Sequence, residues 1–296
     1  MAWTDLIRRL GTSFSPRLLS LPASVLLLSI IILGGRCEAF DTVLVKVAGP
    51  HATYLTAELF KPQGKGPFPA VVLMHGCGGW QPAVLDALHD HAWYFLDHGY
   101  VVLNLDSFGS RGNSGGTVCE SNAQLVDALT YRTNDAFDAL HYLRTLEFVD
   151  PNNTFLMGQS NGGSVAINAA KMSGPHGFRA VAAYYPWCGS LGASRVNLKS
   201  PLIIFSGSRD DWVPAKECRN RTSIGKQLKV VEYANAPHSF DVRLQLQRYL
   251  GKLIGFDKSA TENSRAQMLA FFDARLDGEI QRRQVSQLDA TEHVPR

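Results

Sequence analysis

The hexapeptide Gly-Gln-Ser-Asn-Gly-Gly at residues 158–163 constrains this chain more than any other segment. A short apolar run precedes it, and the sequence after it, Ser-Val-Ala-Ile-Asn-Ala-Ala-Lys, is typical of a helix. A strand, a Gly-x-Ser-x-Gly turn and a helix in this order predict a nucleophile elbow, which presents Ser160 at the carboxyl edge of a sheet. Gly158 and Gly162 lack a Cβ, so strand and helix can approach closely. The alternative interpretation of the motif by itself is a glycine-rich loop at a helix start.

Chain order limits the partners of this serine, because in such a fold the acid and then the histidine follow the nucleophile. The downstream histidines are His176, His238 and His293. His176 lies in a loop just past the serine helix and His293 in a polar tail. His238 leaves the strand-like run 229–233, so it is the candidate general base.

The candidate acid lies between Ser160 and His238, where Asp210 and Asp211 are the only aspartates. Both follow the buried, β-rich run 202–205, at the carboxyl end of a predicted strand. Asp210 is preferred as the group that orients the histidine, because Asp211 is well placed to cap a helix that begins near residues 214–216. The sequence leaves the choice between the two open.

An oxyanion hole needs two backbone donors near the serine. The N–H of Asn161, at the start of the predicted helix, is one. The second is expected in the loop after the buried run 70–74, which continues as His-Gly-Cys-Gly-Gly-Trp. Cys77 is the preferred donor, with Gly76 and Gly78 as alternatives.

Five segments together carry a resemblance to a known family. They are His-Gly-Cys-Gly-Gly at 75–79, Asp-Ser-Phe-Gly-Ser-Arg-Gly at 106–112, the hexapeptide at 158–163, Gly-Ser-Arg-Asp-Asp-Trp at 207–212 and Pro-His-Ser-Phe-Asp at 237–241. With these segments the chain resembles the dienelactone hydrolase family of the α/β-hydrolases, and a helix pattern near 266–276 agrees with it. The resemblance implies a Ser-Asp-His triad and hydrolysis of carboxylic esters. The namesake enzymes of that family use cysteine where this chain has Ser160, which favours general ester hydrolysis over dienelactone hydrolysis.

Hydrophobic periodicity predicts an α/β domain over residues 40–276, with a mostly parallel central sheet of about eight strands and helices on both faces. The expected strands are residues 42–47, 54–60, 70–74, 100–105, 154–157, 180–184, 202–205 and 229–233, and the clearest helices are 84–97 and 123–145. No repeat or linker divides this region, and a content of 45% hydrophobic residues is enough for a large core. Residues 277–296 form a polar, mobile tail in this prediction.

The amino terminus has the pattern of a targeting segment. Arg8, Arg9 and Arg17 precede the uncharged apolar stretch 18–33, and Cys-Glu-Ala at 37–39 ends in a small-x-small pattern. This predicts an export signal, residues 1–39, cleaved after Ala39. The alternative is an uncleaved membrane anchor, so a membrane is an expected partner only if this segment is retained.

Export would place the remaining cysteines, Cys77, Cys119, Cys188 and Cys218, in an oxidising compartment. Four cysteines allow three connectivities. We favour Cys77 with Cys119 and Cys188 with Cys218, because each pair joins loops near the expected catalytic edge. Four buried free thiols are the alternative.

Charge and metal-ligand spacing narrow the possible partners. A net formal charge of +3 gives no general attraction to nucleic acid. His89 and His91 lie in an acidic stretch, but two residues apart on a helix they face different ways. We therefore expect no metal, no other cofactor and no nucleic-acid partner.

The sequence has no long insertion of the kind that would form a large lid over the site. The expected substrate is therefore a small-molecule ester with a small or short acyl group. Trp80, Trp187 and Trp212 lie in or beside the catalytic-edge loops and are candidates for lining the substrate site. Arg111 is a candidate for pairing with a substrate carboxylate. A structural role for Arg111 and simple packing for the aromatic residues are the alternatives. The rival functions are a serine peptidase or amidase with the same triad, and a non-catalytic binding protein on a hydrolase scaffold.

Overall fold

The computed structural model describes residues 40–48, 52–113 and 116–277. The predicted export signal and the predicted tail beyond residue 277 lie outside these residues. The strands are β1 (Asp41–Lys46), β2 (Tyr54–Phe60), β3 (Phe68–Met74), β4 (Val101–Leu105), β5 (Val149–Gln159), β6 (Val181–Tyr184), β7 (Arg195–Leu198), β8 (Leu202–Gly207), β9 (Thr222–Gly225), β10 (Leu228–Tyr233), β11 (Gln247–Tyr249) and β12 (Lys252–Ile254). The α-helices are α1 (Pro82–Asp97), α2 (Asn122–Arg144), α3 (Asn161–Met172) and α4 (Lys258–Asp273). Short 3-10 helices are Gly109–Arg111, Thr117–Glu120, Cys188–Leu191 and Ala215–Glu217.

Eight of the strands form one sheet in the order β1-β2-β4-β3-β5-β6-β8-β10. β1 and β2 pair antiparallel, β2 pairs antiparallel with β4, and every other pair in this sheet is parallel. The prediction of a mostly parallel, eight-stranded α/β-hydrolase sheet is confirmed. Because β3, β5, β6, β8 and β10 are parallel, the loops that follow them lie at one edge of the sheet.

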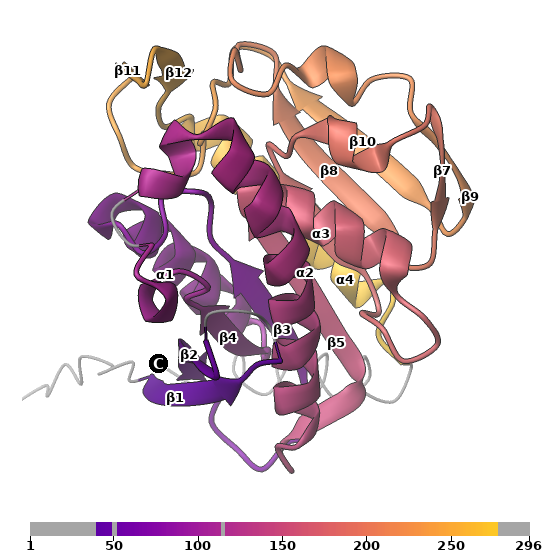
Figure 1. Cartoon of the computed structure of the whole chain (residues 1–296). Coiled ribbons are helices and arrows are strands. Elements are labelled where there is room, and N and C mark those ends of the chain that lie inside the picture. The colour runs from indigo at the N-terminus through magenta and orange to yellow at the C-terminus, as the bar shows by residue number, and fades with distance from the viewer. Residues whose placement is uncertain (1–39, 49–51, 114–115, 278–296) are drawn as a thin grey trace, which may run out of the picture. The chain divides into compact units, whose positions relative to one another are not determined.

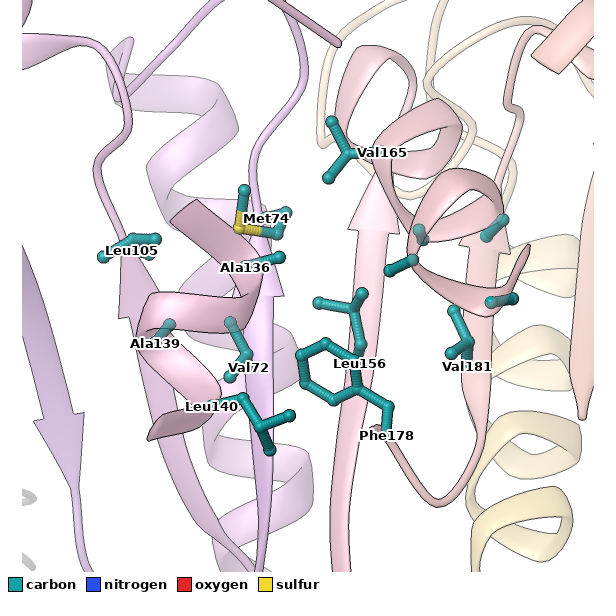
Figure 2. Close-up of a cluster of buried hydrophobic side chains, with 14 of the residues drawn as sticks. Val72, Met74, Leu105, Ala136, Ala139, Leu140, Leu156, Val165, Phe178 and Val181 are labelled. Carbon is teal, nitrogen blue, oxygen red and sulfur yellow. The ribbon is translucent and has the colours of Figure 1, made fainter. Parts of the chain in front are cut away.

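Helices cover both faces of this sheet, with α2 and α3 in front and α1 and α4 behind (Figure 1). The period of two along β3 divides its residues between the faces. Val72 and Met74 belong to the core cluster that includes Ala139 and Leu140 of α2 (Figure 2). Val71, by contrast, packs in the cluster formed with α1 and α4. A strand buried on both faces therefore reads as a continuous apolar run rather than an alternating one.

Two small strand pairs lie outside the main sheet and were not predicted. β7 and β9 pair in parallel, and β11 and β12 form an antiparallel hairpin between His238 and α4. The hairpin is joined to the histidine loop, since the N–H of His238 donates to the carbonyl of Leu253 (3.3 Å) and the N–H of Gly255 donates to the carbonyl of His238 (3.2 Å). It therefore lies beside the carboxyl edge of the sheet.

Both of the favoured disulfides are present, Cys77–Cys119 and Cys188–Cys218. Across residues 40–48, 52–113 and 116–277, no helix has the length and apolar character needed to cross a membrane.

Candidate active site

The turn between β5 and α3 holds Ser160 in a conformation that few residues adopt. Its backbone angles are φ 51° and ψ −114°, so a non-glycine residue sits at positive φ. Glycines make the turn possible. A Cβ added at Gly158 would lie 2.0 Å from the carbonyl oxygen of Gly162, and one added at Gly162 would lie 2.3 Å from the carbonyl oxygen of Met74. The two motif glycines therefore bring α3 against the ends of β5 and β3.

Ser160, His238 and Asp210 form one hydrogen-bonded chain. The Nε2 atom of His238 lies 3.0 Å from the Oγ of Ser160, and its Nδ1 lies 2.7 Å from Oδ2 of Asp210. An ionised carboxylate can only accept, so Nδ1 carries the proton and Nε2 is left to accept the serine proton. The histidine and the aspartate are both buried, whereas the serine is partly exposed. This arrangement can activate a serine nucleophile.

Asp210 and Asp211 have different partners. Oδ1 of Asp210 accepts the N–H groups of Trp212 and Val213, both at 2.9 Å, which fixes the carboxylate toward His238. Asp211 instead accepts the N–H of Leu253 in the hairpin at 2.7 Å. The expected helix near residues 214–216 is a single 3-10 turn without a side-chain cap, so the prediction that Asp211 caps a helix is wrong.

The two predicted oxyanion donors lie beside the serine. Asn161 is the first residue of α3, and its N–H has no acceptor within the helix. The loop that contains Cys77 passes close to Ser160, since a Cβ added at Gly76 would lie 3.3 Å from Cβ of Ser160. Cys77, Ser160 and Asn161 all line one cavity.

His75 fixes the peptide that carries the Cys77 N–H. Its Nδ1 donates to the carbonyl of Gly76 (2.6 Å), and its Nε2 accepts the N–H of Ser107 (3.1 Å). In a trans peptide the C=O and N–H groups point in opposite directions, so holding the Gly76 carbonyl also aims the Cys77 N–H. Burial, with the charge of Arg132 adding to it, holds the pKa of His75 well below its ordinary value of 6.5. The ring is therefore neutral, as this pair of hydrogen bonds requires.

Arg132 of α2 contacts the same loop, although no sequence motif marks it as a site residue. Its guanidinium is fully buried, donates to Oδ1 of Asn161 (2.6 Å) and to the carbonyl of His75 (2.6 Å), and packs on the ring of Phe108. Burial lowers the pKa of Arg132 to about 10, which leaves it charged at neutral pH. One cation thus contacts residues on both sides of the expected oxyanion position.

Asp241 joins three parts of the site behind the triad and was also missed. Its Oδ2 accepts from Gln159 (2.8 Å) and His91 (2.7 Å), and its Oδ1 accepts the hydroxyl of Tyr185 (2.5 Å). The Tyr185 ring in turn packs against the ring of His238. Burial alone would raise the pKa of Asp241, but the hydrogen bonds from His91, Tyr185 and Gln159 outweigh it and hold the pKa below its ordinary value.

Two cavities meet at Ser160. The first, which we call the His238 cavity, has a volume of about 420 Å³ and is lined by His238, Ser160 and Trp212 among others. The second, which we call the α3 cavity, has a volume of about 330 Å³ and is lined by Ser160, Asn161, Trp187 and Trp212 among others. The predicted aromatic residues Trp187 and Trp212 therefore do face cavities beside the serine.

Two of the predicted substrate-binding residues, Trp80 and Arg111, do not line either cavity. Trp80 packs against the core cluster of α1 and α4 and lines neither cavity. The side chain of Arg111 is 1% exposed and forms a two-pronged ion pair with Asp135, with both N···O distances 2.8 Å. It also donates to the carbonyl of Ser107. The prediction that Arg111 pairs with a substrate carboxylate is wrong, because its buried charge is already matched inside the protein.

The acidic stretch in α1 has structural partners. His89 lies 2.8 Å from a carboxylate oxygen of Glu58, and His91 contacts Asp241. In the described part of the chain, no three or more His, Cys, Asp or Glu side chains are grouped so that they could hold a metal ion.

Solved structures with the same fold include several hydrolases. A candidate dienelactone hydrolase from Klebsiella pneumoniae has 15% identity, a TM-score of 0.63, and coverage of 79% of this chain and 98% of its own. A dienelactone hydrolase-like promiscuous phosphotriesterase from metagenomic libraries has 18% identity, a TM-score of 0.60, and coverage of 81% and 100%. Esterase 2 of Thermogutta terrifontis has 17% identity, a TM-score of 0.56, and coverage of 79% and 91%.

At such low sequence identity, the structural similarity to these hydrolases establishes the fold and not the substrate. No curated protein matches the sequence at a significant level. The model of the dienelactone hydrolase family, in contrast, matches residues 55–276, a region that contains Ser160, Asp210 and His238. The chain therefore belongs to the dienelactone hydrolase family.

Proposed function

We propose that this chain is a serine hydrolase that cleaves small or short-acyl carboxylic esters through an acyl-enzyme on Ser160. The observation that carries the proposal is the chain of hydrogen bonds from Asp210 through His238 to Ser160, 2.7 Å and 3.0 Å long. A carboxylate, an imidazole and a hydroxyl in this order are the parts that acyl transfer to serine requires.

In the first half of the proposed reaction, Oγ of Ser160 bonds to the ester carbonyl carbon while its proton moves to Nε2 of His238. The carbonyl oxygen becomes an anion and receives hydrogen bonds from the N–H groups of Cys77 and Asn161. When the tetrahedral centre collapses, the bond to the alkoxy oxygen breaks, and Nε2 gives its proton to that oxygen. The alcohol leaves, and the acyl group remains on the serine.

In the second half, a water molecule takes the place of the alcohol. His238 accepts one proton from the water as its oxygen bonds to the acyl carbon, and the ester bond to Ser160 then breaks. The same proton passes to Oγ, so the serine is restored and a carboxylic acid is released. Asp210 stays ionised and stabilises the imidazolium in both halves.

The test is hydrolysis of p-nitrophenyl esters of increasing acyl length by the full chain, beside Ser160→Ala. We expect the substitution to remove activity by a factor on the order of 10⁴ or more, with an unchanged unfolding midpoint. Mass spectrometry of a quenched reaction should find the acyl group on the peptide that contains Ser160. Equal rates for the two proteins would overturn the triad assignment. Turnover of p-nitroanilides in preference to the esters would instead favour the amidase, and no turnover of either would favour a binding protein.

We further propose that the protein is exported. Two disulfides are typical of proteins that fold in oxidising compartments. The mass of the protein purified from its native cells tests this, because cleavage after Ala39 gives a chain that begins at Phe40. A full-length chain in the membrane fraction would favour the anchor.

A further inference from the structure

The two cavities at Ser160 share part of their walls but differ in the catalytic groups that they expose. Cys77, Ser160 and Trp212 line both. His238 lines the first cavity and not the second, whereas Asn161 lines the second and not the first. An ester bound at Ser160 would therefore have one of its two substituents in each cavity.

The chemistry decides which substituent belongs where. The imidazole must give its proton to the leaving oxygen, so the alkoxy group has to lie on the side of His238. The carbonyl oxygen lies between the N–H groups of Cys77 and Asn161. The acyl chain then takes the remaining direction, past Asn161 along α3. This reasoning rests on the proposed function.

The walls also restrict the kind of substituent. In the described part of the chain, neither lining contains an Asp, Glu, Lys or Arg. The apolar lining of the His238 cavity includes Val84, Val242, Leu244, Tyr249 and Ile254. The apolar lining of the α3 cavity includes Leu125, Val126, Leu129, Trp187 and Val213. A charged substituent would lose hydration in either cavity without gaining a partner.

We infer that the substrates are uncharged esters with an apolar group on each side, the acyl group in the α3 cavity and the alcohol group in the His238 cavity. Each cavity then controls one substrate preference. Selectivity for acyl length depends on Val213 and Leu125, and selectivity for the alcohol depends on Val84 and Leu244.

Two matched substitutions separate the cavities. Val213→Phe narrows the α3 cavity, and Val84→Phe narrows the His238 cavity by the same change. Both side chains are half-buried, so the larger ring can be accommodated without opening the core. The backbone N–H of Val213 that binds Asp210 is kept. Leu125→Ala and Leu244→Ala are a second matched pair that enlarges the same two cavities.

The measurement is kcat/KM of the full chain on two ester series. The first varies the acyl group from acetate to octanoate with p-nitrophenol as the fixed alcohol. The second varies the alcohol from methyl to hexyl with a fixed acetyl group. In the unsubstituted chain each methylene that enters a cavity should raise kcat/KM by about fourfold, until the cavity is full.

Val213→Phe should lower the octanoate-to-acetate ratio by about tenfold or more and leave the hexyl-to-methyl ratio unchanged. Val84→Phe should do the reverse, and the two alanine variants should shift the same ratios upward. Addition of a carboxylate to the end of the acyl group or of the alcohol group of the ester should lower kcat/KM.

Three outcomes would reject this inference without rejecting the proposed esterase. Val213→Phe could change the hexyl-to-methyl ratio while Val84→Phe changes the octanoate-to-acetate ratio, one variant could change both ratios, or the charged esters could be hydrolysed faster than the uncharged ones. No hydrolysis of any ester in either series by the unsubstituted chain would reject the proposed function, and the cavity assignment with it.

Discussion

Asp210 and Asp211 are adjacent in the sequence but have different partners in space. Asp210 is buried against His238, whereas the side chain of Asp211 is 44% exposed and joins the hairpin through Leu253 and Arg248. We predict that Asp210→Asn lowers kcat by a factor on the order of 10⁴, because the amide no longer holds the imidazole in the tautomer that accepts the serine proton. Steady-state kinetics on a p-nitrophenyl ester measures this.

Asp211→Asn is the matched control for that substitution. It removes the same charge one residue away, and we expect less than about a tenfold loss of kcat, since the exposed ion pair with Arg248 contributes little. A larger loss of kcat for Asp211→Asn than for Asp210→Asn would show that Asp211, and not Asp210, is the acid of the triad.

Arg132 connects α2 to Asn161 and to the His75 carbonyl, on the two sides of the expected oxyanion position. We predict that Arg132→Met lowers kcat by about 10–100-fold with little change in KM, because the cation orients Asn161 and the His75 carbonyl and so acts on the transition state more than on bound substrate. Arg132 is a positioning residue in this account. Its effect should also appear as weaker inhibition by a trifluoromethyl ketone, which forms a tetrahedral oxyanion on serine.

Arg111→Met provides the comparison, since it removes another buried arginine from the neighbouring loop. Both substitutions should reduce the free energy of unfolding, because each leaves buried acceptors without a donor. Only Arg132→Met should change kcat. Equal kinetic losses in the two variants would mean that both act through the fold alone.

The proposed nucleophile, acid and base could be selected from the sequence, because motif order and the ends of predicted strands restrict each to one or two residues. Arg132 and Asp241 could not. Their partners are 29 to 150 residues away in the chain, and an arginine or aspartate inside a helix or loop carries no local sign that it is buried. The partner of Arg111 could not be identified for the same reason, since its ion pair with Asp135 is visible only in the fold.

The Cys77–Cys119 disulfide ties the loop of the predicted oxyanion donor to the segment before α2. Both of its cysteines line the His238 cavity, whereas neither Cys188 nor Cys218 lines it or the α3 cavity. We predict that the double substitution Cys77→Ser with Cys119→Ser lowers kcat by about tenfold, because the loop can then move the Cys77 N–H away from the oxyanion. Kinetics in oxidising buffer measures this.

The other disulfide is a close control. The two bridges span 42 and 30 residues, so chain entropy gives each about 4 kcal/mol of stabilisation. Cys188→Ser with Cys218→Ser should therefore lower stability to urea by a similar amount and leave kcat unchanged. If both double variants keep full kcat while folded, the disulfide does not position the loop.

Most strands of the main sheet could be predicted because they contain a run of four or more apolar or β-branched residues. Polar residues interrupt that run in β4 and β10. The hairpin β11–β12 could not be predicted. Its strands have three residues each, too few to show alternation, and it is held by the backbone of His238 and the carboxylate of Asp211. β7 and β9 have four residues each, and β8 lies between them in the sequence, so their pairing is not a local feature.

Stability of the whole domain should fall as the solution becomes acidic. Burial lowers the pKa of His75 and of His91, so the folded chain holds both rings neutral below pH 6.5, where the unfolded chain protonates them. Each histidine then removes about 1.4 kcal/mol of unfolding free energy per pH unit, from about pH 6.5 down to its own depressed pKa. Asp135 and Asp273, whose pKa values burial raises, act in the opposite direction at lower pH.

Urea unfolding at pH 7.5, 6.5 and 5.5 isolates one histidine when the chain is compared with His91→Gln. The glutamine amide can still donate to Asp241 but does not titrate. Its slope below pH 6.5 should be smaller by up to about 1.4 kcal/mol per pH unit. Parallel slopes would show that His91 does not contribute to acid unfolding.

The carboxylate of Asp241 has a consequence for how this protein loses activity. It accepts hydrogen bonds from Gln159, which precedes Ser160, from Tyr185, whose ring packs on His238, and from His91 of α1. A loop that opens alone would have to leave this charge without partners in the interior, which is costly. A state in which only one of these loops has opened is therefore high in free energy. We expect the folded chain to keep its full activity up to the temperature at which its core unfolds.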